Sequence, residues 1–395
     1  MSSLKPKVLI VSLETWEIIA RLPKALQKSG FEVAALCHRD SFLATTRYVD
    51  QLFFLNSRRW GSRILRQLMQ IIKNWNPILI VSGDDRTVLF LLRMIQLHLE
   101  GKQPLPPNML ETLRLSFGNF DWMAEATSKR LTLQRAQELG LKTPRFACVN
   151  SVVEAVSRAK EFGWPVVVKK STGWGGNGVT FCDSEDQVAA IYAKYREASG
   201  WKGMLKSRLM QFRGWTLGPD WFPADHSVTV NEFIRGKPTT ISVAAAAGKI
   251  LAHVTAIREQ CYPDARGPSS VVRFINHPDM MRTAEKMIGH WGASGLLGFD
   301  FMLTDDGEAT LIECHSRPIV GSYMGRLSGR DLCLALHHHL AGLEIPAPSA
   351  PSHEIVARFP QEWRRDPQSP YLLNAYHDVP WDDPGLFEKL LRDCR

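Results

Sequence analysis

The stretch that decides the fold is Leu296–Leu303 (LLGFDFML), followed by Leu311–Pro318 (LIECHSRP). These two apolar runs flank a short polar segment that contains Asp306–Gly307, and an Asp-Gly pair between apolar runs is a strong β-hairpin signal. A two-residue turn at this pair sets Asp300 opposite Glu313 on the two strands. We therefore expect two carboxylates to face each other in an otherwise apolar hairpin.

Two opposed carboxylates repel each other unless a cation lies between them. Directly opposed strand residues have Cβ atoms about 4.5–5.5 Å apart, and carboxylate oxygens suit Mg²⁺, which commonly binds one or two carboxylates together with substrate phosphates. His315 lies two residues after Glu313 and so shares its face of the strand. The hairpin alone leaves a second interpretation open, a surface turn with two solvated acids.

The composition indicates a globular protein, with room for two or three domains in 395 residues. Hydrophobic residues make up 45% of the chain and charged residues 22%, which is ordinary for such proteins. The formal net charge of +8 is spread along the chain and fits an anionic small ligand. No zinc-finger, helix-turn-helix or RNA-binding pattern is evident, so we expect no nucleic-acid partner.

The seven cysteines are scattered and form no Cys-x-x-Cys pair, which is typical of reduced thiols in a cytoplasmic protein. The apolar run after Lys7 is too short for a signal peptide, and no run approaches the roughly 18 apolar residues that span a bilayer. We expect a cytoplasmic protein without a membrane partner. A homo-oligomer is compatible with the sequence but not required by it.

The first part of the chain alternates between strand and helix signals. Residues 7–12 and 31–37 are strand-like and flank a helical segment at 16–29, a spacing typical of a parallel, doubly wound sheet. The loop at 12–16 has no Gly-x-Gly-x-x-Gly, which argues against dinucleotide binding. Asp84–Arg86 follow a later strand, where such sheets bind ligands, so they are candidate substrate contacts; the alternative is that Asp85 caps a helix.

A predicted strand at residues 164–170 ends in Lys169 and Lys170 and runs directly into Gly173–Gly178, which contains four glycines. The backbone N–H groups of such a turn can converge on phosphate oxygens. Because the lysines precede the glycines, this is no Walker loop. A lysine at the end of the strand nevertheless favours phosphate binding.

Two other segments carry suggestive residues. Residues 199–222 are basic and aromatic, and such residues can stack on a base or bind a peptide. We favour a mobile flap or a packed surface insert instead. The triplet His337–His339 lies in a predicted helix, where consecutive side chains point about 100° apart and cannot share one metal ion.

The order of these blocks resembles the ATP-grasp superfamily over roughly residues 120–340. The 13-residue step from Asp300 to Glu313 also fits the hairpin of that superfamily. The matching blocks are Ser128-Lys129, Pro165–Lys169, Gly173-x-Gly-Gly-x-Gly178, Asn231–Gly236, Gly298–Leu303 and Leu311–Pro318.

The resemblance implies a mixed α/β and α+β fold, in which an ATP-grasp domain follows a Rossmann-like pre-ATP-grasp domain. The implied boundaries are residues 1–118 for the first domain and 119–343 for the ATP-grasp domain, with a small lid subdomain at about 145–235. Residues 344–395 form a C-terminal extension in this division, and the sequence does not reveal its role.

The resemblance also implies roles for single residues. Asp300 and Glu313 hold Mg²⁺, with Mn²⁺ as an alternative, and Arg317 stabilises the transferred phosphoryl group or the anionic intermediate. Lys169 acts in both binding and catalysis. The residues implied to bind ATP are Lys129 and Lys169 at the phosphates, Gly173, Gly175, Gly176 and Gly178 in the loop that closes over them, and Asn231, Phe233, Ile234, Met302 and Ile312 around the adenine.

Three positions depart from the pattern of the superfamily. His315 stands where an Asn metal ligand is usual, so it is a third candidate metal ligand, with a general base and a hydrogen-bond donor as alternatives; imidazole suits Mn²⁺ better than Mg²⁺. Lys170 replaces a Pro and adds positive charge near the phosphates. Pro238 and Thr239 lie where many members have a ribose-binding Glu, which leaves the ribose contacts open.

The function that the resemblance implies is an ATP- and Mg²⁺-dependent ligase, which joins a small-molecule carboxylate to an amine through an acylphosphate. The alternatives are other ATP-grasp chemistry, of the carbamoyl-phosphate-synthase or kinase type, and a nucleotide-binding protein without catalysis. The sequence does not identify the carboxylate or the amine.

Overall fold

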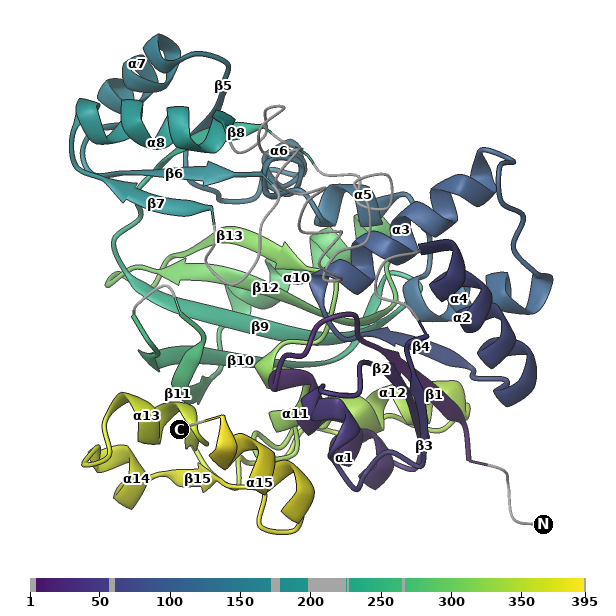
Figure 1. The fold of residues 1–395 in the computed structure, drawn as a ribbon. Helices are drawn as coiled ribbons and strands as arrows, with labels where there is room; N and C mark the ends of the chain where they lie inside the picture. Colours follow the sequence, from purple (N-terminus) through teal and green to yellow (C-terminus); the bar gives the residue numbers. More distant parts are fainter. Residues whose placement is uncertain are drawn as a thin grey trace.

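Three β-sheets carry the fold of the described chain in the computed structural model (Figure 1). The structure describes residues 5–56, 61–171, 178–197, 225, 227–264 and 267–393. A parallel sheet lies near the N-terminus, a long central sheet follows, and a small antiparallel sheet stands above the central one in the view of Figure 1. This arrangement confirms the predicted mixed α/β fold.

The N-terminal sheet is parallel, with the strand order β3-β2-β1-β4. Its side chains alternate between two layers: Leu9 and Leu36 pack with α2, α3 and α4, whereas Val8 and Ala35 pack with α1. The predicted doubly wound sheet is confirmed, although the half-exposed edge strand β3 was not predicted. The elements are β1 (Lys7–Val11), α1 (Leu22–Lys28), β2 (Glu32–Cys37), β3 (Gln51–Phe54), α2 (Gly61–Trp75), β4 (Leu79–Ser82), α3 (Asp85–Leu99) and α4 (Pro107–Phe117).

The central sheet has the strand order β13-β12-β9-β10-β11-β14-β15. Val243 and Phe299 lie on the face that packs against α10 (Pro278–Trp291). The opposite face carries Asp300, and α11 (Val320–Met324) and α12 (Leu332–Leu340) cover part of it. The strands are β9 (Lys237–Ala246), β10 (Lys249–Cys261), β11 (Ser269–Ile275), β12 (Gly295–Leu303), β13 (Ala309–His315), β14 (Ile355–Arg358) and β15 (Tyr376–Asp378).

The small sheet is antiparallel, with the order β5-β8-β6-β7. Two helices, α7 and α8, bury Val166, Val168 and Val230 on one of its faces. Between the N-terminal layer and this sheet run α5 (Trp122–Ala126) and α6 (Lys129–Glu138), and α6 packs against β13. The elements of the small sheet are β5 (Phe146–Val149), α7 (Val152–Phe162), β6 (Val166–Lys170), β7 (Val179–Cys182), α8 (Glu185–Glu197) and β8 (Val228–Glu232).

The β12–β13 hairpin has the predicted pairing of Asp300 with Glu313, but its turn differs from the prediction. The loop has three residues, 305–307, because the N–H of Thr304 pairs with the carbonyl of Glu308, and Gly307 has the left-handed φ of 85° that such loops require. Ile312 is then an extra residue in β13, a bulge between the turn and the two acids. The predicted two-residue turn is wrong, and the bulge restores the predicted register.

The C-terminal residues complete the central sheet. β14 pairs with β11, and β15 pairs with β14. This segment also binds the N-terminal layer: Arg21 donates to the Asp378 carbonyl (3.1 Å), and Thr46 donates to Asp383 (2.5 Å). Its helices are α13 (Gln361–Arg365), α14 (Pro370–Asn374) and α15 (Pro384–Arg392). The division of the chain into three domains at 118 and 343 remains a proposal.

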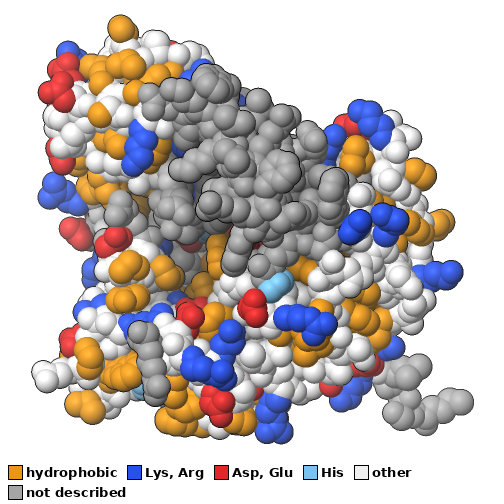
Figure 2. Space-filling model, in the orientation of Figure 1, with side chains coloured by type: hydrophobic (Ala, Val, Ile, Leu, Met, Phe, Trp, Pro, Cys, Tyr) orange, Lys and Arg blue, Asp and Glu red, His pale blue; other side chains and the backbone are white. Residues whose placement is uncertain are grey.

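The described surface gives two further findings. On the face drawn in Figure 2, Lys and Arg side chains are interspersed with acidic and apolar ones rather than gathered into one basic stripe. Within the part of the chain that the structure describes, no helix combines the length and the apolar character needed to cross a bilayer.

Phe299 offers a test of how tightly the central sheet packs. Its side chain is fully buried and stacks on Trp291, with ring centroids 6.2 Å apart. We predict that Phe299→Ala lowers the free energy of unfolding in urea by about 3–5 kcal/mol, the cost of emptying such a site. Leu373→Ala is the control, since this side chain is 86% exposed, and a change within about 0.5 kcal/mol is expected there. Equal effects of the two substitutions would contradict the packing described.

Glu362 makes stability depend on pH. It is fully buried, accepts from Ser270 Oγ (2.7 Å) and forms a two-point contact with Arg365 (2.8 and 2.6 Å). Burial raises the pKa of this carboxyl, but Arg365 and the two serines Ser270 and Ser369 lower it more, so the pKa lies below its ordinary 4.5. The stabilisation is therefore complete above pH 4.5 and is lost as the pH falls through the folded-state pKa.

We predict that Glu362→Gln lowers the thermal midpoint at pH 7 and that the difference from the wild type shrinks as the pH falls below 4.5. The exposed Glu388, substituted by Gln, serves as the control and should change the midpoint little at either pH. A loss of stability in Glu362→Gln that is the same at every pH would mean that the charge contributes nothing.

Candidate functional site

The site forms where the start of α6, the end of β6 and the β12–β13 hairpin meet. Lys129 is the first residue of α6, and the N-cap residue Ser128 holds that helix end by accepting from Leu131 N (3.2 Å). The N–H of Lys129 donates to the carbonyl of Ser171 (2.9 Å), directly after β6. The small sheet therefore fixes the position of Lys129 above the central sheet.

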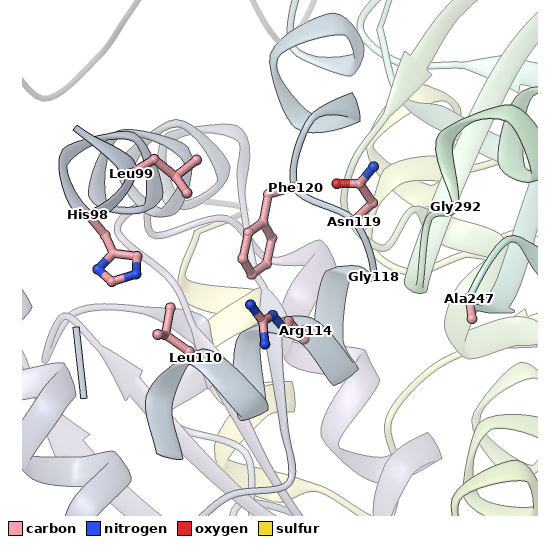
Figure 3. A pocket seen from close by; sticks show the side chains of 9 residues that line it. All are labelled: His98, Leu99, Leu110, Arg114, Gly118, Asn119, Phe120, Ala247 and Gly292. Atoms are coloured by element: carbon pink, nitrogen blue, oxygen red, sulfur yellow. The ribbon is translucent and has the colours of Figure 1, made fainter. Parts of the chain in front are cut away.

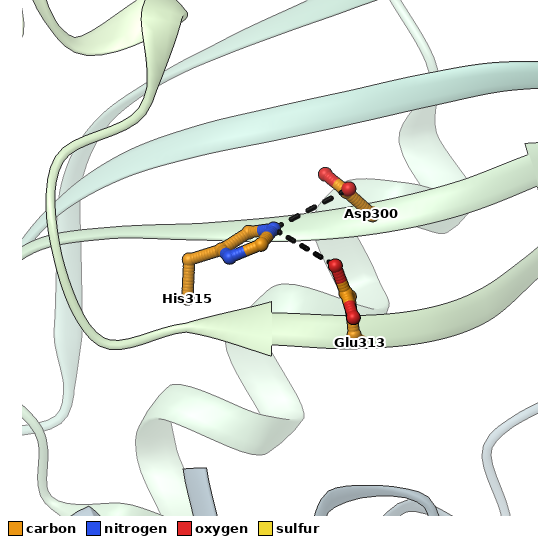
Figure 4. A group of neighbouring side chains, drawn as sticks. All are labelled: Asp300, Glu313 and His315. Carbon is orange, nitrogen blue, oxygen red and sulfur yellow. Dashed lines mark ion pairs between the residues drawn. The ribbon is translucent and has the colours of Figure 1, made fainter. Parts of the chain in front are cut away.

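Asp300, Glu313 and His315 converge on one point of the hairpin (Figure 4). Their candidate ligand atoms all lie within 4.8 Å of one another. His315 Nε2 lies 3.3 Å from Asp300 Oδ2 and 3.6 Å from Glu313 Oε1, so the ring nitrogen points between the two carboxylates. The solvated surface hairpin that the sequence left open does not fit this half-buried arrangement.

Glu313 is held as an anion by the cations around it. Its other oxygen, Oε2, lies 2.5 Å from Lys129 Nζ. Burial raises the pKa of Glu313, but Lys129, His315 and Lys169 outweigh it and hold the pKa well below its usual range. For His315 burial has the opposite effect and lowers the pKa. Asp300 and Glu313 outweigh burial there, so the pKa of His315 lies above its ordinary value. A metal ion between the carboxylates competes with the proton on His315.

Lys169 has a buried side chain and no anionic partner among the described residues. It belongs to β6 and is 6% exposed. Burial, and to a smaller extent Lys129, lower the pKa of its ammonium, while Glu313 and Asp300 oppose the shift. The resulting pKa is about 8. No carboxylate of the described chain lies within ion-pair distance of its Nζ. Because a buried charge without a partner is costly, this position favours an anionic ligand.

Asn231 has an acceptor atom without a partner at the other end of the site. Its Nδ2 donates to Thr229 Oγ1 (2.9 Å) and to the Val167 carbonyl (3.3 Å), whereas its buried Oδ1 has no hydrogen-bond donor. A ligand amine can satisfy that oxygen. Phe233 and Ile234 follow β8 directly and are half-buried.

The remaining predicted residues are placed as follows. Met302 and Ile312 lie half-buried in β12 and β13, and Met302 shares the face of Asp300. Gly178 directly precedes β7 and has a φ of 84°. Gly173, Gly175 and Gly176 lie outside the described residues, as does the 199–222 insert, so the predictions for them stand as predictions.

Arg317 faces the N-terminal layer. Its Nη2 lies 2.9 Å from Asp85 Oδ2, and its guanidinium stands 5.4 Å from the centroid of the Trp16 ring. The helix cap that the sequence suggested for Asp85 is wrong: Asp84 caps α3 by accepting from Thr87 N (2.8 Å). Asp84 is fully buried, whereas Asp85 is free to pair with Arg317. Loops of the N-terminal layer thus reach the hairpin through one charged pair.

Sequence reasoning missed Arg258. Its Nη1 lies 3.8 Å from Asp300 Oδ2, and its Nη2 donates to the Gly267 carbonyl. The strand pairings explain the contact: Asp300 pairs with Thr240 on β9, Thr240 pairs with Ala256 on β10, and Arg258 is the next residue on that face. Ala256 and Arg258 lie two residues apart on β10 and therefore on the same face of the sheet. The sequence shows this spacing, but it does not show that β10 lies near β12.

Comparisons with known proteins give a family model and a curated relative to which this chain is similar. Residues 128–210 match the family model described as the ATP-binding domain of the carbamoyl-phosphate synthase L chain. A curated relative, the formate-dependent phosphoribosylglycinamide formyltransferase of Synechococcus sp. (strain RCC307), is 22% identical over 294 residues. The match covers 73% of this chain and 65% of the relative, which is less than two thirds of its length.

Two solved structures share the fold over most of the chain. The biotin carboxylase domain of the 2-oxoglutarate carboxylase of Hydrogenobacter thermophilus, in complex with MgADP, ADP and bicarbonate, is 16% identical with a TM-score of 0.62; the match covers 89% of this chain and 72% of that one. Carboxyaminoimidazole ribonucleotide synthase of Aspergillus clavatus, in complex with ATP, is 13% identical with a TM-score of 0.59, and the match covers 87% and 79%. At these identities the likeness concerns the fold.

The acids of the hairpin can be tested as metal ligands directly. We predict that Asp300→Asn and Glu313→Gln each weaken Mn²⁺ binding by more than about tenfold, since even changes next to a ligand have effects of that size. Electron paramagnetic resonance of free Mn²⁺, with and without ATP, measures the affinity. Glu308→Gln is the matched control, because Glu308 lies exposed at the turn of the same hairpin. Unchanged binding in both acid variants would place the metal elsewhere.

Proposed function

We propose that this chain is a member of the ATP-grasp superfamily and acts as an ATP- and Mg²⁺-dependent ligase that joins a carboxylate to an amine through an acylphosphate. The observation that carries the proposal is the convergence of Lys129 and Lys169 with the opposed carboxylates of Asp300 and Glu313. Phosphoryl transfer needs positioning and cations on the developing charge, and little covalent help from side chains. The formate-dependent formyltransferase among the relatives supports a reaction that uses a carboxylate.

The residues present fit ATP at two separate points. The buried ammonium of Lys169 has no anionic partner in the described chain, which fits a phosphate, and the buried Oδ1 of Asn231 lacks a donor, which fits the adenine amine. Asp300 and Glu313 would hold Mg²⁺, with His315 as a third ligand when its ring is neutral. Mg²⁺ in such a site neutralises charge on the phosphates during transfer.

The proposed reaction has two steps. An oxygen of the substrate carboxylate attacks the γ-phosphorus of ATP, the bond to the bridging oxygen breaks, and ADP leaves. The amine nitrogen then attacks the acyl carbon, phosphate leaves with the electron pair of the C–O bond, and the amine loses a proton to solvent. Lys129 and Lys169 hold the phosphates, while Arg317 binds the anionic oxygens of the acylphosphate.

The acceptor site is proposed to lie between Arg317 and the loops of the N-terminal layer. The Arg317–Asp85 pair (2.9 Å) and the ring of Trp16 border this region. A substrate carboxylate can bind Arg317 in place of Asp85, and Asp85 can then accept from a substrate amine. We propose small-molecule carboxylates and amines as partners, and the cytoplasm as location because all the described cysteines are free.

Bicarbonate is a second candidate for the carboxylate. It is favoured by a neighbouring structure, the biotin carboxylase domain of Hydrogenobacter thermophilus, which was solved in complex with bicarbonate. The two candidates differ in one requirement. If bicarbonate is the carboxylate substrate, turnover requires no added organic acid, whereas the first candidate requires one.

The test measures ADP release by the purified chain with carboxylate–amine pairs, each omitted in turn, with bicarbonate alone as a separate arm. Hydroxylamine traps an acylphosphate as a hydroxamate. We expect turnover only when both cosubstrates are present, and hydroxamate when the amine is replaced. ADP release that no carboxylate stimulates would contradict the ligase.

Two variants separate ATP binding from chemistry. A ligand at 100 times its dissociation constant adds about 2.7 kcal/mol of stability, so MgATP should raise the thermal midpoint. We predict that Lys169→Ala abolishes this shift, because the buried ammonium is lost, whereas Glu313→Gln keeps part of the shift and loses turnover. Lys160→Ala, exposed on α7, is the control. Full turnover in Glu313→Gln would exclude this hairpin as the metal site.

A further inference from the structure

A cleft of about 470 Å³ opens at the junction between the N-terminal layer and the central sheet (Figure 3). It lies apart from the site described above, and none of the residues assigned there lines it. One wall comes from the end of α3 and from α4, and the other from the β9–β10 turn and the end of α10. The side chains that matter are His98, Leu99, Leu110, Arg114, Asn119 and Phe120.

Arg114 brings an uncompensated positive charge to this cleft. Its guanidinium and the ring of Phe120 both line the cleft (Figure 3), and no carboxylate of the described chain is within ion-pair distance of the guanidinium. No acidic residue lines the cleft, and the nearby Glu100 is already paired with Lys102 (2.8 Å) and Arg93 (3.4 Å). The charge of Arg114 is therefore available to a ligand.

The two other polar side chains have their acceptor atoms in use. His98 Nδ1 accepts from Leu105 N (3.2 Å), so a neutral ring carries its proton on Nε2. Asn119 Oδ1 accepts from Asp121 N (3.3 Å), which leaves the Nδ2 group as a donor. Arg114, the Nε2–H of a neutral His98 and the Nδ2 group of Asn119 thus offer donors to the cleft, and Asn119 Oδ1 keeps one lone pair. A guanidinium with two further N–H donors in the same lining favours an anion.

The rest of the lining is apolar. Leu99 is 66% exposed, and Leu110 and Phe120 are half-buried, so a bound apolar body would remove their surface from water. The volume lies within the range of about 300–1,000 Å³ that is usual for small-molecule sites. We propose that this cleft binds a small amphipathic anion, with its carboxylate, sulfonate or phosphate on Arg114 and its apolar body against Phe120.

The position of the cleft gives such a ligand a structural consequence. The segment 117–120 links α4 to α5, and it is tied to the central sheet because Asn119 N donates to the Gly292 carbonyl (3.2 Å) and Ser294 N to that of Phe117 (3.0 Å). A ligand that contacts both Arg114 and Gly292 therefore bridges the two sides of this junction. Such a ligand would stabilise the observed arrangement of the N-terminal layer against the central sheet.

The test uses 8-anilino-1-naphthalenesulfonate, an aromatic sulfonate whose fluorescence rises on binding, with the full chain. We expect saturable binding that weakens at least tenfold in Arg114→Met, which keeps the apolar stem and removes the charge. Asn119→Asp should weaken it as strongly, because a carboxylate replaces a donor. Arg282→Met, on the exposed surface of α10, is the matched control and should bind as the wild type does. Circular dichroism checks that each variant is folded.

Three outcomes would overturn the proposal. Equal affinity in the wild type, Arg114→Met and Asn119→Asp would mean that the probe does not use these donors. Displacement by saturating MgATP would place the probe in the nucleotide site. Competition by 1-naphthoate, with none by the uncharged 1-naphthalenemethanol, is the result expected for an anion site. Equal competition by both compounds would reduce the cleft to an apolar surface.

Discussion

The ion pair between Lys129 and Glu313 (2.5 Å) is the interaction on which the site depends. It joins the first turn of α6 to the hairpin of the central sheet, and the Lys129 backbone is tied in turn to the carbonyl of Ser171. One residue therefore connects the central sheet, the helix and the small sheet. Without its charge, the two opposed carboxylates would depend on His315 and on Lys169 and Arg258, neither of which lies as close to them as Lys129 does. Lys129 therefore both neutralises charge in the site and holds three parts of the fold together.

Local patterns predicted the parts of the fold that local chemistry determines. Alternation and an Asp-Gly pair predicted the hairpin and placed Asp300 opposite Glu313. The prediction nevertheless succeeded through two deviations that offset each other, a longer loop and the bulge at Ile312. An apolar run such as residues 309–312 reads the same with or without a bulge, because both of its faces are buried or half-buried.

The residues that could not be predicted are those positioned by distant parts of the chain. Arg258 reaches Asp300 because β9 lies between β10 and β12. The sequence of neither β10 nor β12 predicts this strand order. The pair of Arg317 with Asp85 requires Asp84 rather than Asp85 to cap α3, and the two neighbouring acids cannot be told apart by type. The sequence therefore predicted which side chains are suited to the site. It did not predict which side chains from distant segments contact each other.

The contact between the last described segment and the N-terminal layer affects how the chain matures. Arg21, Thr46 and Tyr48 meet Asp378, Asp382 and Asp383 through hydrogen bonds and charges. On the ribosome these early residues emerge long before their partners, so the surface waits uncovered during synthesis. Water can satisfy the polar groups of this surface in the meantime, but Ala20 and Phe42 of the same layer are buried against Phe359, Leu386 and Leu390 in the finished fold. The nascent chain thus exposes an apolar patch until its last residues are made, and such a patch favours aggregation.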